Sequence, residues 1–157
     1  MKKLTLLIIG LILIQPNPAM AGDEEDVTAV IKEFWVDVSN KKVNASKIYP
    51  NGLWQAKSSG GLWDFLTPNE VETMINDSPN NLKFRPHHIE VGIVGKNKDV
   101  AHANYYLVGT ITGPDEKIIA KDYRTRALEV IVKKNNGWVI VSSHYSPLHG
   151  GMGVILD

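Results

Sequence analysis

The chain of 157 residues contains no cysteine. A protein without cysteine forms no disulfide framework, so its hydrophobic core alone must hold the fold. The same absence excludes thiol catalysis and metal sites built from cysteine. The sequence also lacks internal repeats, low-complexity segments and any catalytic signature that names a reaction or a cofactor. Composition therefore indicates an ordinary globular domain, and its function has to be sought in individual residues.

The N-terminus has the pattern of a secretory signal peptide. Lys2 and Lys3 precede an apolar run over residues 4–14, and Ala19-Met-Ala21 supplies the small-residue pattern before a cleavage site. The run of 11 residues is shorter than the roughly 20 that a membrane-spanning helix needs. We expect residues 1–21 to be removed and residues 22–157 to form one domain, periplasmic or secreted in a bacterium, without a membrane association after cleavage.

The net charge gives no sign of a polyanionic partner. Cleavage after Ala21 leaves 15 basic residues against 17 acidic ones, a formal charge of −2. Proteins that bind nucleic acid usually carry a large basic excess. We therefore expect no nucleic acid as a partner.

Two helices are predicted in the first half of the mature chain. Apolar residues recur at steps of three and four up to Asn40, which predicts one amphipathic helix; they are Val27, Val30, Ile31, Phe34, Trp35 and Val38. A second helix is predicted from Pro68 to Asn76, because Thr67 can cap it and Glu70 completes a capping box. The segment between them, residues 45–66, has turn signals and large rings but no clear period.

The second half reads as strands separated by turns. Alternating or β-branched segments cover residues 82–94, 100–112, 117–132 and 138–145. Helices followed by an antiparallel meander predict an α+β domain whose helices cover one face of a curved sheet.

A candidate site lies at the open end of the last hairpin, which turns at Asn135-Asn136-Gly137. In one register Gly137 is the left-handed residue of a three-residue loop and Lys134 pairs with Trp138. Arg126 then faces Ser146 and Leu128 faces His144. Arg126 and His144 become diagonal neighbours on one face, within reach of each other.

A second register is compatible with the same sequence. A two-residue turn at Asn136-Gly137 would pair Asn135 with Trp138 and place Glu129 opposite His144. Arg126 would then lie on the other face of the sheet. The apolar residues that alternate with Arg126 favour the first register, because they make its face the apolar one; they are Leu128, Val130 and Val132.

Three segments resemble the SnoaL-like branch of the nuclear transport factor 2-like superfamily. They are Tyr49-Pro-Asn-Gly-Leu-Trp54, residues 126–133 and residues 138–146, in the same order of elements as in that family. The resemblance implies a cone: a strongly curved, mostly antiparallel sheet wrapped around N-terminal helices, with a hydrophobic cavity, often dimeric through the sheet. Members include isomerases, cyclases, hydrolases, dehydratases and binding modules, so the fold does not fix the function.

The resemblance matches Arg126, His144 and Ser146 to polar positions of the family. Ser142 stands where many relatives have another histidine, and Asn51 stands where an aspartate is common. An arginine in an apolar cavity must be paired, and its planar fork suits a bound carboxylate or phosphate. The alternative is an internal partner, for which Glu90, Glu129 and Asp157 are candidates. His144 is a candidate general base, a donor to a ligand oxygen, or a core imidazole bonded to a backbone carbonyl.

A carboxylate, several aromatic rings and a histidine pair are further candidates. Asp64 lies between Trp63 and Phe65, so it is a candidate acid or base, with a surface cap as the alternative. Trp54, Trp63, Tyr105 and Tyr106 are candidate cavity walls, with the two tyrosines on opposite faces of their strand, although such rings more often belong to the core. His87 and His88 are not expected to bind metal together, because neighbouring strand side chains point to opposite faces.

These observations lead to three hypotheses. The first is an exported, dimeric module that binds a small, partly apolar molecule through Arg126, His144, Ser146, Trp54, Trp63 and Tyr106, without metal or cofactor. The second is a lyase, isomerase or hydrolase of the same fold, with His144 or Asp64 moving a proton. The third is a protein-interaction module that uses the face of the sheet.

Overall fold

The computed structural model describes residues 22–135 and 137–148. Its elements are α1 (Asp23–Asn40), the short 3-10 helix η1 (Ala45–Lys47), β1 (Leu53–Ala56), β2 (Asp64–Leu66), α2 (Pro68–Asn76), β3 (Asn81–Val94), β4 (Val100–Thr112), β5 (Ile118–Lys134) and β6 (Gly137–Pro147). The expected signal peptide, the tail from His149 and Asp157 lie outside the described residues. Among the described helices, none is long and apolar enough to cross a membrane.

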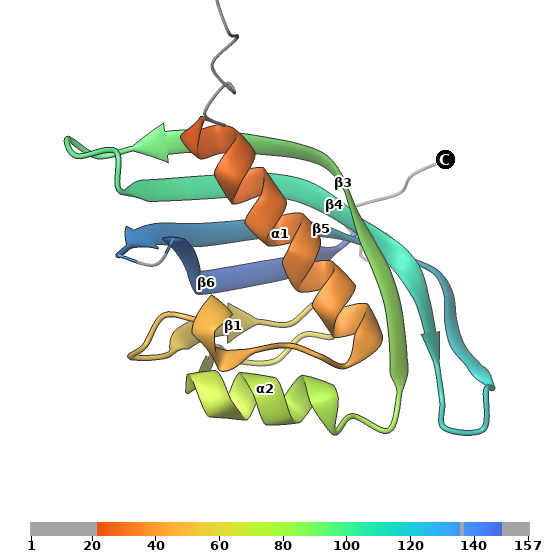
Figure 1. Ribbon diagram of the computed structural model, residues 1–157. Helices are drawn as coiled ribbons and strands as arrows, with labels where there is room; N and C mark the ends of the chain where they lie inside the picture. Colours follow the sequence, from red (N-terminus) through yellow and green to blue (C-terminus); the bar gives the residue numbers. More distant parts are fainter. Residues whose placement is uncertain (1–21, 136, 149–157) are drawn as a thin grey trace, which may run out of the picture.

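The sheet has six strands in the order β2-β1-β6-β5-β4-β3 (Figure 1). Neighbouring strands are antiparallel except for β1 and β6, which run parallel. The long strands β3, β4 and β5 bend strongly, and α1 crosses the inside of the bend. The expected α+β cone with a mostly antiparallel sheet is confirmed.

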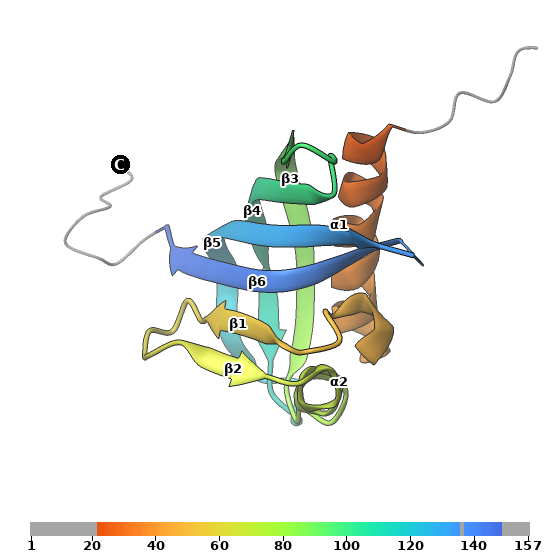
Figure 2. The same ribbon diagram turned by 90° about the vertical axis from the view of Figure 1, so that its left-hand side faces the viewer.

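Both predicted helices are present. α1 buries the apolar stripe that the period of the sequence predicted, including Ile31, Phe34 and Trp35. The capping box of α2 is formed: the Thr67 side chain accepts from the Glu70 amide, and the Glu70 carboxylate accepts from the Thr67 amide at 2.7 Å. Figure 2 shows α1 along one side of the sheet, which is called the inner face below; in the described part of the chain no helix covers the opposite, outer face.

Two bulges account for much of the curvature. His88 has φ 49° at the point where the pairing of β3 with β4 shifts between His87 and Glu90. Asp122 has φ 56° beside the shift in the pairing of β4 with β5. An extra residue in one strand bends it and increases its twist. The bends turn the far ends of β3 to β5 around the end of α1.

The hairpin of β5 and β6 follows the first register at its open end and neither predicted register at its turn. Arg126 pairs with Ser146 and Leu128 with His144, as the first register predicted. The expected pairing of Lys134 with Trp138 is wrong, since Lys134 pairs with Gly137. A bulge separates the open end of the hairpin from its turn end, since the pairing of β5 with β6 shifts by one residue between Val130 and Ile131.

The expectation that the Arg126 face of β5 is the apolar, inward one is also wrong. Ala127, Glu129 and Ile131 are buried on the inner face, whereas Arg126 and Leu128 are exposed on the outer face. The prediction failed because Leu128, Val130 and Val132 are apolar, whereas the other face of the strand carries a glutamate, Glu129, and glutamates usually lie on the surface. The buried set forms one core with α1, and its members on the sheet include Ala103, Tyr105, Leu107, Ile140 and Tyr145.

Candidate functional site

A pocket of about 260 Å³ lies inside the cone, between α1, α2, β1 and the bent sheet. Its wall is largely apolar; the residues that form it include Phe34, Trp35, Val38, Met74, Ile75, Leu82, Phe84 and Leu107. These side chains come from four elements, α1, α2, β3 and β4. The pocket is therefore a product of the curvature of the sheet and of the helices that close it.

Aromatic stacking forms one end of the pocket. The rings of Phe84 and Tyr123 stack with their centroids 4.9 Å apart. Gly109 lies between these two residues in the sheet, paired with both. A Cβ at Gly109 would meet the Lys83 carbonyl oxygen at 2.0 Å and the Phe84 ring at 2.6 Å, so only glycine allows this close approach.

Hydroxyl groups supply the polar part of the wall. Ser58 and Tyr123 both line the pocket, and their hydroxyls are hydrogen-bonded to each other. Tyr145 lines it from β6. A ligand oxygen inside this pocket would therefore meet hydroxyl donors and acceptors. Lys57 also lines the pocket, and its ammonium pairs with Asp64 at 2.8 Å.

Behind Tyr145 lies a buried carboxyl group. Glu129 is fully buried, and its Oε1 accepts from the Tyr145 hydroxyl at 2.9 Å and from the Ser143 hydroxyl at 3.3 Å. Within the described residues, Oε2 has no hydrogen-bond partner. Burial raises the pKa of Glu129, and the hydrogen bonds from Tyr145 and Ser143 oppose that rise only in part. Compared with a glutamate in water, the site therefore shifts Glu129 towards its protonated form.

Two tyrosines share this environment. The Tyr105 hydroxyl accepts from the Trp35 indole at 2.8 Å. Burial raises the pKa of Tyr105 and of Tyr145 well above the usual value of a phenol, and the negative charge of Glu129 raises both further. Both phenols therefore stay protonated. The hydrogen bond between the Tyr145 hydroxyl and the Glu129 carboxyl group thus connects a residue of the pocket wall to the core.

Arg126, His144, Ser146 and Tyr106 are brought together, but on the outer face. They line a second pocket of about 320 Å³, together with His88, Glu90, Asn104 and Leu128. Arg126 and Tyr106 are directly paired across β5 and β4. Among the described residues, the ion pairs do not include Arg126. The polar end of the interior pocket is thus made by Tyr145, Tyr123 and Ser58.

The predicted aromatic residues also lie outside the interior pocket. Trp54 is half-exposed and contacts Phe65, with ring centroids 5.3 Å apart. Trp63 lies beside His144, with centroids 5.6 Å apart. Asp64 is in β2, where its carboxylate pairs with Lys57 at 2.8 Å and remains about half exposed.

Sequence reasoning did not single out Glu129 and Tyr145 as a site. A signal was present: a glutamate interrupts the apolar run from Ala127 to Val132, and the facing strand offers hydroxyls. A charged residue in such a run is buried only if hydrogen bonds meet it there. No group of three or more candidate metal ligands occurs in residues 22–135 and 137–148.

Comparison with protein-family models and with curated proteins gave no match. Solved structures do match. A nuclear transport factor 2-like superfamily protein from Salmonella enterica serovar Typhimurium has 16% identity, covers 85% of this chain and 97% of its own, and gives a TM-score of 0.66. A candidate dehydratase of the NTF2-like family from Streptomyces avermitilis has 16% identity, with coverage of 82% and 97% and a TM-score of 0.63.

An NTF2-like protein from Cytophaga hutchinsonii has 14% identity, covers 77% of this chain and 94% of its own, and gives a TM-score of 0.58. At these identities the likeness concerns the fold and not the activity. The order of elements, the bent six-stranded sheet and the helix across its inside agree with it. The chain has the nuclear transport factor 2-like fold.

Proposed function

We propose that this protein binds a small, largely apolar molecule with a hydrogen-bonding oxygen in the interior pocket. The observation that carries the proposal is a pocket of about 260 Å³ with aromatic and aliphatic walls and a few hydroxyls from Tyr145, Tyr123 and Ser58. Pockets of this composition are typical of small-molecule sites, in which few polar groups fix the orientation of an apolar ligand. Binding, with or without turnover, is the function that this geometry supports best.

The interior supports a ligand without a strong charge. In the described chain, Lys57 is the charged residue of the wall, and its ammonium is already paired with Asp64 at 2.8 Å. Glu129 favours its neutral form. A charged ligand would lose its hydration without gaining a counter-ion of its own. Cyclic ketones and phenols therefore fit better than carboxylates or phosphates.

Thermal unfolding with cyclohexanone and 4-methylphenol tests this proposal. A ligand that binds only the native state stabilises it by about 2.7 kcal/mol at 100-fold excess over its Kd. Leu82→Trp is expected to reduce the rise in melting temperature, because the indole fills the pocket that Leu82 lines. Val94→Trp is the matched control, since Val94 is exposed at the end of β3. If Leu82→Trp responds as the wild type does, the ligand binds elsewhere.

An enzymatic role within the same pocket would rest on Tyr145 and Glu129. A buried carboxyl group with a raised pKa, hydrogen-bonded to Tyr145 in the pocket wall, is a candidate general acid for a ligand oxygen. A lyase, isomerase or hydrolase of this kind would lose turnover in Glu129→Gln while ligand binding persists. Persistence of turnover in that variant would remove Glu129 from any mechanism.

The segments around Trp54, Arg126 and His144 support the SnoaL-like branch as the proposed family branch.

The proposed location is the periplasm or the exterior of a bacterium. The charged, apolar and small-residue pattern of residues 1–21 supports it. Mass spectrometry of the protein from a bacterial periplasm tests the export: the chain should begin at Gly22. A chain that retains residues 1–21 would contradict it.

A homodimer through the outer face is a further part of the proposal. The face carries exposed large rings on β1, β2 and the loop between them: Trp54, Phe65 and Trp63 are each about half exposed, at 52%, 49% and 52%. Leu62 and Leu128 extend this aromatic patch. Monomeric proteins rarely expose contiguous apolar patches of this kind, and two copies can cover theirs by a two-fold interface.

A further inference from the structure

All three arginines of the chain lie on one face of the sheet. They are Arg85 in β3 and Arg124 and Arg126 in β5, and all three are exposed on the outer face. Arg124 and Arg126 are two residues apart on one strand, so both point the same way. Arg85 reaches the same face from two strands away. The fold thus gathers every guanidinium of the protein into one region.

The pairing of the strands fixes how these groups are arranged. One row across the sheet is Arg85, Val108 and Arg124, and the next row is His87, Tyr106 and Arg126. Successive rows on one face are about 6.8 Å apart, and groups two strands apart are separated by about 9.6 Å. Val108 and Tyr106 therefore lie in the middle, with cationic or imidazole groups on either side.

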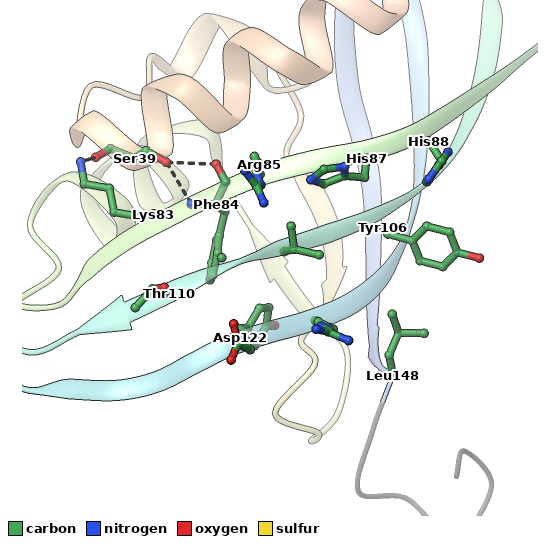
Figure 3. A pocket seen from close by; sticks show the side chains of 14 residues that line it. Ser39, Lys83, Phe84, Arg85, His87, His88, Tyr106, Thr110, Asp122 and Leu148 are labelled. Carbon is green, nitrogen blue, oxygen red and sulfur yellow. Dashed lines mark hydrogen bonds between the residues drawn. The ribbon is translucent and has the colours of Figure 1, made fainter. Parts of the chain in front are cut away.

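The surface is hollowed at this place. A groove of about 930 Å³ is lined by Arg85, Arg124, Val108 and Tyr106, with Lys83 and Thr110 at one end. Figure 3 looks into it: Lys83, Phe84, Arg85, His87 and His88 come from β3, Tyr106 and Thr110 from β4 and Asp122 from β5. His88 and Tyr106 also line the pocket that contains Arg126, so the two hollows adjoin.

The charges of the groove are not neutralised by the described residues. The ion pairs of the described chain all use lysines: Lys47 with Glu33, Lys57 with Asp64 and Lys133 with Asp23. Asp122 lines the groove and Glu90 lines the adjoining pocket, but neither is within 4.0 Å of an arginine nitrogen. Three arginines and Lys83 thus outnumber two carboxylates, in a chain whose formal charge is zero.

We propose that this groove binds an organic dianion, with its charge on two carboxylates or on a phosphate, attached to a flat apolar body. Each guanidinium presents a planar fork that holds a carboxylate or a phosphate through two hydrogen bonds. The aromatic ring of Tyr106 and the side chain of Val108 would contact the body between those groups. An anion also relieves the mutual repulsion of the arginines, so charge complementarity selects this ligand class.

This site is separate from the interior pocket. The groove lies on the outer face and is lined by arginines and Lys83, whereas the interior pocket presents mainly apolar side chains and hydroxyls. The stacked rings of Phe84 and Tyr123 line both and stand between them. A ligand of the groove is therefore a charged molecule of a different chemical class.

Calorimetric titration of the protein at low ionic strength tests the proposal. The probes are benzene-1,4-dicarboxylate and phenyl phosphate, with benzoate as the singly charged control. Benzene-1,4-dicarboxylate or phenyl phosphate should bind at least about tenfold more tightly than benzoate, which corresponds to one additional charge-assisted hydrogen bond. The binding should weaken as salt is raised, because the charges are exposed and screened.

Single substitutions locate the site. Arg85→Gln and Arg124→Gln should each weaken binding of the better dianion by about tenfold. Lys96→Gln removes an exposed charge from the turn between β3 and β4 and should bind like the wild type. Leu82→Trp should also bind like the wild type, which separates this site from the interior pocket. The proposal is overturned if benzoate binds as tightly as both dianions, or if the arginine variants match Lys96→Gln.

Discussion

The Tyr145 hydroxyl donates a hydrogen bond of 2.9 Å to Oε1 of Glu129 across the central strands β6 and β5. This contact joins a residue of the pocket wall to a carboxyl group in the core. Because the carboxyl is buried without a cation beside it in the described chain, its protonation is tied to the stability of the fold. The pair therefore gives both a structural and a chemical way to test the interior site.

The stability of the protein should depend on pH through Glu129. Its folded pKa is raised by burial from the usual glutamate value of 4.5, so the unfolded chain releases this proton at lower pH than the folded one. From about pH 4.5 up to the folded pKa the folded state holds more protons, and the unfolding free energy falls with rising pH by up to about 1.4 kcal/mol per pH unit.

Glu129→Gln should lack this contribution, because an amide does not titrate. Urea denaturation across that pH range, compared between wild type and variant, measures the difference. The pKa of Glu70 is lowered by its hydrogen bonds from Thr67. Because Glu70 is present in both proteins, its effect on the pH dependence cancels in the difference between their unfolding free energies. Parallel pH profiles of the two proteins would show that Glu129 is not a buried titrating group.

Removal of the Tyr145 hydroxyl should destabilise the fold. Tyr145→Phe leaves Oε1 with the longer bond from Ser143 and costs about 1–3 kcal/mol of unfolding free energy. Tyr49→Phe is the matched control; Tyr49 is half-buried and its ring contacts Lys134, a contact that phenylalanine preserves. Equal unfolding free energies of the two variants in chemical denaturation would argue against the buried hydrogen bond.

The two faces of β5 should respond differently to truncation. Ile131 is fully buried, so Ile131→Ala should cost about 2–5 kcal/mol of unfolding free energy. Leu128 is 42% exposed, so Leu128→Ala should cost less than about 1 kcal/mol in the monomer. Guanidinium denaturation at low protein concentration measures both. The reverse order would mean that the Arg126 face is the inner one after all.

Association through the outer face should depend on the aromatic patch. The proposed dimer predicts that sedimentation equilibrium gives twice the mass of the mature chain. Trp54→Ser should shift the equilibrium to the monomer, since large aromatic side chains dominate the energy of interfaces. Val36→Ser is the control, because Val36 is comparably exposed on α1 and not on the sheet. Equal masses for both variants would exclude the patch as the interface.

Much of the fold could be predicted because its signals are local. The period of α1, the capping box of α2 and the turns between β3, β4, β5 and β6 all lie within short stretches of sequence. The short strands β1 and β2 were not assigned, because they depend on distant partners. Trp54 pairs with Phe65 on one side and with Ser142, far along the chain, on the other.

The candidate site was harder to predict, and the reason lies in β5. Leu128 and Ile131 are equally apolar, so hydrophobicity did not identify the inner face. The burial of Glu129 decides it, and that burial depends on hydroxyls from Ser143 and Tyr145 in the facing strand. The grouping of Arg126 with His144 was predicted correctly, since it needs only the register. The wall of the interior pocket could not be predicted, because it depends on the curvature of the sheet. That curvature arises from the bulges at His88 and Asp122.

The most direct test of the interior site is to measure intermolecular nuclear Overhauser effects between bound 4-methylphenol and methyl groups of the protein. We expect cross-peaks from the probe to Leu82 and Leu107, which line the pocket inside the cone. Cross-peaks to Val108 and Leu128 instead, which lie on the outer face, would contradict it.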